Sequence, residues 1–90
     1  MSTAHALRDF LRVNPPEFHG EPDPARAEEW LQQITRDLDT SEISDGRLRV
    51  LFAVRQLKGD AYHWWGRVQA RVEQDYEEFS ALFLENYFPE

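Results

Sequence analysis

Apolar residues recur at helical spacing over most of the chain from residue 23 onward. Asp23 and Pro24 suit the N-cap and the first position of a helix, so a helix is predicted from there to about Asp39. Its apolar residues fall at i, i+3, i+4, i+7 and i+11, which is one face of a helix. They are Ala27, Trp30, Leu31, Ile34 and Leu38.

Two further helices are predicted on either side of Gly59. Ser44 is expected to cap the first of them, which runs to Gly59 and is apolar on most sides, with Leu51 and Phe52 at inner positions. Asp60 is expected to cap the next, which ends before Asp75. This helix carries its apolar residues at helical spacing: Ala61, Trp64, Trp65, Val68 and Val72.

A last helix is predicted from Asp75, as N-cap, to Pro89, which stops it. Its inner face consists of Phe79, Leu82, Phe83 and Tyr87. Aromatic residues therefore dominate the predicted core, which includes Trp30, Phe52, Trp64, Trp65, Phe79, Phe83 and Tyr87.

Residues 1–22 show no helical period, because apolar positions are interrupted by Pro15, Pro16 and Gly20. We therefore predict an extended N-terminal arm. Its large apolar residues must dock on this domain or on another molecule, which makes them candidate protein-binding residues. They are Phe10, Leu11, Val13 and Phe18, and the bundle is expected to need only Phe18 among them.

The predicted fold is thus all-α: a small bundle of about four short helices over residues 23–90, preceded by the extended arm of residues 1–22. A hydrophobic content of 41% supports a real core. The formal charge of -7 disfavours direct binding of nucleic acid or of anionic membranes. No apolar run approaches the ~20 residues of a membrane span, and no secretion signal precedes Leu11, so we expect a cytoplasmic protein.

Candidate chemistry is sparse. Cysteine is absent, and His5, His19 and His63 have no metal-ligand spacing, so we expect no metal site. The four glycines form no phosphate-binding pattern, so no cofactor is expected. The acid pairs Glu28–Glu29 and Glu77–Glu78 lie in first turns of predicted helices, where carboxylates favour the helix dipole. No catalytic residue is therefore assigned, and we expect a protein that is not an enzyme.

Four segments together resemble the Gag capsid domain of gypsy-type long-terminal-repeat retrotransposons and of Arc-like host proteins domesticated from them. These segments are PPEFHG at Pro15 to Gly20, AEEWL at Ala27 to Leu31, QLKGDAYHWW at Gln56 to Trp65, and EEFSALFLENYFP at Glu77 to Pro89. The likeness spans Val13 to Pro89. One departure is the Asp75-Tyr76 pair, where the family commonly has Thr-Trp; both a capping residue and an aromatic residue are kept.

The resemblance implies the N-terminal lobe of a capsid protein, whose copies cluster into a shell. It lacks the second helical lobe, which links neighbours, and the zinc knuckle, which packages RNA. Self-association is then the expected activity, with a homo-oligomer or a shell as the product. The alternative is a domesticated adaptor that dimerises or binds an apolar, extended peptide. A third class, an unrelated enzyme or nucleic-acid binder, would need a cofactor site or a basic groove, for which the sequence offers no residues.

Overall fold

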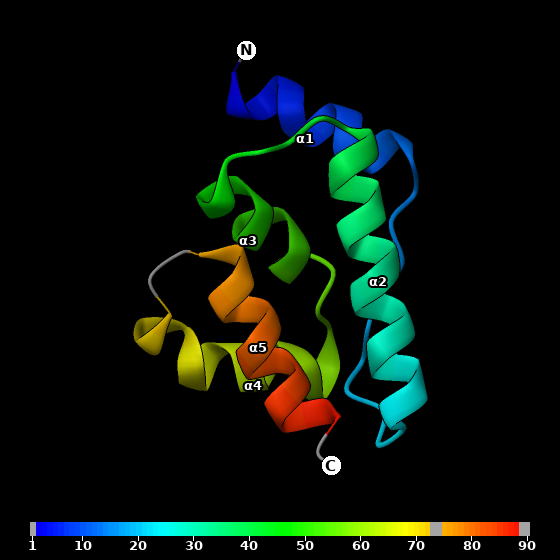
Figure 1. The fold of residues 1–90 in the computed structure, drawn as a ribbon, viewed down its shortest axis with the longest axis vertical. Coiled ribbons are helices and arrows are strands. Elements are labelled where there is room, and N and C mark those ends of the chain that lie inside the picture. The colour runs from blue at the N-terminus through cyan, green and yellow to red at the C-terminus, as the bar shows by residue number, and fades with distance from the viewer. Residues whose placement is uncertain (1, 73–74, 89–90) are drawn as a thin grey trace.

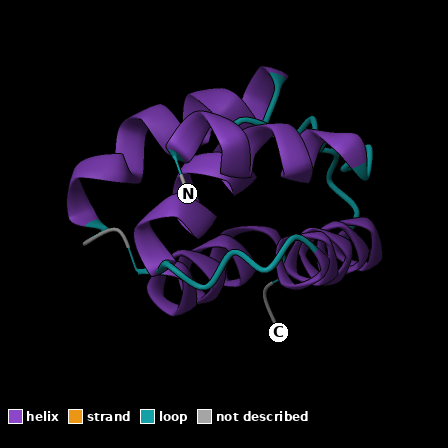
Figure 2. Ribbon diagram, turned by 90° about the horizontal axis from the view of Figure 1, so that it is seen from above, coloured by secondary structure: helices purple, strands orange, loops and turns teal. Residues whose placement is uncertain are grey.

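A computed structural model describes residues 2–72 and 75–88. Over these residues the chain forms five α-helices and one 3-10 turn, with no strand, so the all-α prediction is confirmed (Figures 1 and 2). The elements are α1 (Thr3–Arg12), α2 (Pro24–Thr40), α3 (Gly46–Val54), α4 (Gly59–Val68), η1 (Gln69–Arg71) and α5 (Tyr76–Tyr87).

Helix α1 corrects the prediction that all of residues 1–22 are extended. The Ser2 hydroxyl accepts a hydrogen bond from the His5 amide at 3.1 Å and so caps the helix. Ala6 and Phe10, one helical turn apart, are buried, and α1 contacts α3. The two prolines disfavour a helix only at and just before their own positions, so residues 3–12 were free to form one.

The remainder of the arm, residues 13–22, forms no helix and has a left-handed backbone at Asn14 and Gly20. Phe18 and Leu57 form an isolated parallel β-bridge, in which the Phe18 amide donates to the Gln56 carbonyl and the Lys58 amide donates to the Phe18 carbonyl, both at 2.9 Å. Pro15 and Pro16 cannot donate, but their carbonyls accept from side chains of the bundle. The segment is therefore fastened to the domain along its length.

Helix α2 begins and packs as predicted, with Asp23 accepting from the amides of Ala25 and Arg26. Helix α3 differs at both ends. Its N-cap is Asp45 rather than Ser44, and it stops at Val54 rather than Gly59. The early stop has a tertiary cause, because residues 56–58 leave the helix to pair with Phe18.

Leu51 was predicted at an inner position and is instead 43% exposed. Its neighbours Val50, Phe52 and Ala53 are buried, and Val50 and Phe52 lie on opposite sides of the helix. Helix α3 is therefore covered over most of its circumference, and Leu51 lies on the one face that is exposed.

Helix α4 begins at Gly59, with Lys58 as N-cap and Asp60 inside the first turn, whereas Asp60 was predicted to be the cap. A left-handed backbone at Gly59, with φ of 51°, makes the corner between the Phe18 pairing and this helix. Helix α4 also ends earlier than predicted, at Val68, followed by the 3-10 turn. Helix α5 starts after Asp75 as predicted, while the predicted stop at Pro89 lies outside the described residues.

The core is an aromatic cluster centred on Phe83, with Phe18, Trp30, Trp64, Phe79 and Tyr87 around it. Ring centroids of these partners lie 5.0 to 6.1 Å from that of Phe83, within the range of favourable aromatic pairs. Helix α1 lies across one end of the molecule, beside α3, and the last turn of α5 lies at the other end (Figure 1).

Candidate protein-interaction site

The four apolar residues assigned to the arm separate into two pairs. Phe10 and Phe18 are buried in their own domain, Phe10 stacked on Phe52 at 5.7 Å and Phe18 against Trp30 and Tyr87. Phe10 thus belongs to the core, contrary to the expectation that only Phe18 would be needed. Leu11 and Val13 are 42% and 38% exposed. Of the four, Leu11 and Val13 are therefore the ones that offer apolar surface to another molecule.

The aromatic residues assigned to the core lie inside it. Trp30, Phe52, Trp64, Trp65, Phe79 and Phe83 are buried, while Tyr87 is half-buried and packs on the cluster. Leu51 and Tyr62, which is 60% exposed, were not assigned to a binding surface, yet they are large apolar residues facing outward. Helical periodicity could not separate Leu51 from the core residues, because α3 is apolar on most sides, whereas Tyr62 lies off the apolar stripe predicted for its helix.

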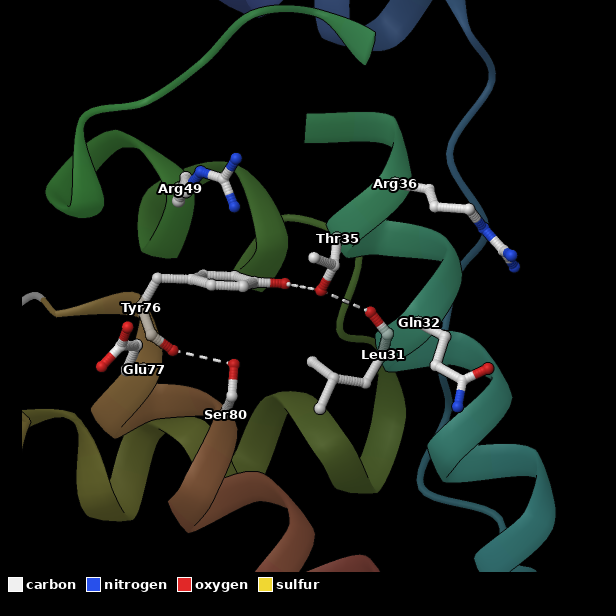
Figure 3. Close-up of a pocket in the computed structure, with 8 residues that line it drawn as sticks. All are labelled: Leu31, Gln32, Thr35, Arg36, Arg49, Tyr76, Glu77 and Ser80. Atoms are coloured by element: carbon white, nitrogen blue, oxygen red, sulfur yellow. Dashed lines mark hydrogen bonds between the residues drawn. The ribbon is translucent and has the colours of Figure 1, made fainter. Parts of the chain in front are cut away.

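A groove with a volume of about 680 Å³ opens where α2, α3 and α5 meet (Figure 3). Its lining consists of Leu31, Gln32, Thr35 and Arg36 from α2, Arg49 from α3, and Tyr76, Glu77 and Ser80 from α5. Sequence reasoning did not find this groove, because three helices far apart in the chain build it. The Asp75-Tyr76 pair was the one sequence signal near it.

The hydroxyl groups inside the groove already have partners within the domain. The Thr35 hydroxyl donates its only hydrogen to the Leu31 carbonyl at 2.8 Å, so the Tyr76 hydroxyl, 2.8 Å away, is the donor in the Tyr76–Thr35 bond. Ser80 donates to the Tyr76 carbonyl at 2.8 Å. What the groove leaves available is mainly apolar surface from Leu31 and the Tyr76 ring, which suits an apolar side chain.

Arg49 closes one side of the groove and is likewise engaged. Its guanidinium carbon lies 5.5 Å from the Tyr76 ring centroid, in range of a cation–π contact. It also donates to the Ile43 carbonyl at 2.6 Å and pairs with the Asp39 carboxylate. Arg36, in contrast, extends away from the Tyr76 ring (Figure 3).

Burial in this region affects the titration of Tyr76. Desolvation of the phenol raises the pKa of Tyr76 above its usual value of 10.0, and this outweighs the opposing effect of the Arg49 charge. The neutral hydroxyl that donates to Thr35 is therefore retained in the folded domain at neutral pH.

No group of three or more His, Asp or Glu side chains suited to a metal ion occurs within residues 2–72 and 75–88. Among the same residues, no helix is long and apolar enough to cross a membrane.

Comparison with protein families bears on this arrangement of helices. The family described as the N-terminal capsid-like domain of the retrotransposon-derived protein PEG10 matches residues 12–88. This chain belongs to that family. The capsid-like domain is a structural module rather than a catalytic one, in agreement with the resemblance to a Gag capsid lobe. No curated protein and no solved structure matches the chain.

Proposed function

We propose that this capsid-like domain is an assembly lobe, whose activity is to associate with other copies of itself as part of a retrotransposon-type shell. The family match over residues 12–88 is the observation that carries the proposal. Support also comes from four outward-facing apolar residues, since such residues gain free energy when a partner covers them. These are Leu11, Val13, Leu51 and Tyr62.

Sedimentation velocity over a range of protein concentrations tests the proposal. The expected result is a weight-average sedimentation coefficient that rises with concentration by mass action. A domain that stays monomeric up to millimolar concentration would contradict it. Leu51→Glu places a charge on an exposed apolar position and should weaken association if α3 is part of the contact. Leu11→Glu serves as a matched change on α1.

The proposed mode of action is binding of protein, without chemistry on a substrate, in a cytoplasmic setting. A charge of -7 opposes phosphate backbones and anionic lipids, so neither RNA nor a membrane is a proposed partner of this domain. Packaging of RNA would be left to other parts of a capsid protein.

A second candidate function is that of an adaptor that binds an apolar, extended peptide. The groove between α2, α3 and α5 favours it, because its hydroxyls are already hydrogen-bonded and its free surface is apolar. Selection from a peptide library displayed on phage tests it, with Ser80→Trp to fill the groove. Ala81→Trp, on the neighbouring exposed position of α5, is the matched control. Peptides that bind the parent and Ala81→Trp but not Ser80→Trp would support the adaptor; equal binding to all three would refute this site.

A further inference from the structure

Helix α1 is attached to the domain through one narrow face. Ala6 and Phe10 are its buried residues, and the Phe10 ring stacks on Phe52 with centroids 5.7 Å apart and ring planes 26° apart. The family match begins at residue 12, at the end of α1. The α3 surface around Phe52 is therefore part of the capsid-like domain, while the helix that covers it lies outside the matched region.

Two exposed residues, Val13 and Asn14, connect α1 to the rest of the chain. Their amides donate to the carbonyls of Phe10 and Leu11, so the chain turns back at the end of the helix. This turn needs Asn14 at φ of 54°, a left-handed backbone that costs free energy for residues other than glycine, although less for Asn than for most. Asn14 also precedes Pro15, and a residue before proline favours the extended conformation. The local backbone preference at Asn14 therefore opposes the closed position of α1, in which this helix covers α3 of its own chain.

We call Val13 and Asn14 the hinge. The residues that directly follow it are hydrogen-bonded to the bundle. The Pro15 carbonyl accepts from Gln56 Nε2 at 2.8 Å, and the Pro16 carbonyl accepts from Trp30 Nε1 at 2.8 Å. Freedom of α1 is therefore confined to Val13 and Asn14, between a rigid helix and a fastened segment. Helix α1 lies at one end of the molecule (Figure 1).

We infer that α1 exchanges between copies of this chain, so that α1 of one copy covers α3 of a second and Phe10 stacks on the partner's Phe52. The inference rests on the proposed self-association and names the surface that carries it. The contacts of α1 are the same in the closed and exchanged states. The equilibrium between closed monomers and exchanged dimers therefore depends on the hinge, Val13 and Asn14, and on protein concentration. Extension at Asn14 removes the left-handed backbone, and Pro15 and Pro16 keep the opened helix directed outward.

A second copy is the occupant that the observations favour. It brings a helix whose buried face, Ala6 and Phe10, already fits the α3 surface, and it receives the same helix in return. A helix from another protein would have to displace α1, which is tethered to its own domain, and the displaced α1 would gain no new contacts in return.

Isotope-filtered NMR of the associated species tests the exchange directly. Carbon-13-labelled and unlabelled protein are unfolded and refolded together, and the oligomer is isolated by size exclusion. Cross-peaks between labelled and unlabelled copies are then sought for the Phe10 and Phe52 rings, which lie close enough to give them. Cross-copy peaks are the expected result. An oligomer with these contacts only within each copy overturns the exchange but leaves self-association standing, whereas absence of any oligomer overturns both.

Hinge variants provide a second, independent measurement. Asn14→Val disfavours the left-handed backbone further, by roughly fivefold per hinge, and two hinges open in a reciprocal dimer, so the dimerisation constant should rise roughly 25-fold. Asn14→Gly adopts a left-handed backbone freely and should give a constant no higher than that of the parent. Circular dichroism checks that both variants keep their helices. Equal constants for the two variants would overturn the role of the hinge.

Discussion

Replacement of Phe83 by alanine tests the centre of the core. Phe83 is fully buried on α5 and meets five other aromatic rings, from the extended segment, α2, α4 and α5 itself. The nearest, Trp30 and Tyr87, have centroids at 5.0 Å. The substitution would leave a cavity at the point where these elements meet.

The expected magnitude follows from three contributions. Removal of a buried phenylalanine loses roughly 1.5 to 3 kcal/mol of hydrophobic transfer free energy. Each aromatic pair adds about 0.5 to 1.5 kcal/mol when fully realised, and the cavity adds more, so measured costs of such truncations cluster at about 3 to 5 kcal/mol. A domain of this size is stable by roughly 5 to 15 kcal/mol, so Phe83→Ala should remove a large share of the free energy of unfolding.

Urea denaturation followed by tryptophan fluorescence measures the loss, because Trp30 and Trp64 both contact Phe83. The matched control is Leu51→Ala, which truncates a 43% exposed residue on α3 and should change the free energy of unfolding by less than about 1 kcal/mol. Thermal melts should separate the two variants by more than about 10 °C. If Phe83→Ala melts within a few degrees of the parent, or Leu51→Ala costs as much, the helix phases described above are wrong.

Other predictions concern α1, alkaline pH and RNA. Phe10→Ala should cost roughly 3 to 5 kcal/mol in urea denaturation, whereas Leu11→Ala, exposed beside it, should cost less than about 1 kcal/mol. Deletion of residues 1–14 should lower both the far-ultraviolet helix signal and the melting temperature, since α1 and Phe10 are lost; an unchanged signal would contradict the α1 described above. The raised pKa of Tyr76 means that the unfolded chain loses this proton first, so stability should fall as pH rises beyond about 10, and less so in Tyr76→Phe, as melts against pH would show. In filter binding at physiological salt, the domain should show no measurable affinity for RNA; tight, salt-sensitive binding would overturn the argument from charge.

Several features were open to prediction because they depend on residues close together in the chain. Asp23 and Pro24 define a helix start by local hydrogen bonding and backbone geometry, and Asp75 does the same for α5. The spacing of Trp30 and Ile34 places both on one face whatever that face later meets. The all-α class, the aromatic core and the Gag-like family all followed from such local patterns.

Only the tertiary structure decided where elements end and which apolar residues are covered. Helix α3 stops at Val54 because the chain after it pairs with Phe18, some forty positions earlier, and no local signal marks that pairing. Leu51 and Phe52 are adjacent apolar residues of one helix, and the contact with Phe10 on α1 determines that Phe52 is the buried one.

The groove and the hinge are also features that only the tertiary structure decided. Thr35 and Tyr76 are far apart in sequence and meet only because α2 and α5 pack together. Asn14 adopts a left-handed backbone because Phe10 and Pro15 are both held by the bundle, against what its own sequence neighbours favour. Local sequence thus determined the helices and their apolar faces, while long-range packing decided which surfaces remained for a partner, because burial depends on contacts between residues distant in the chain.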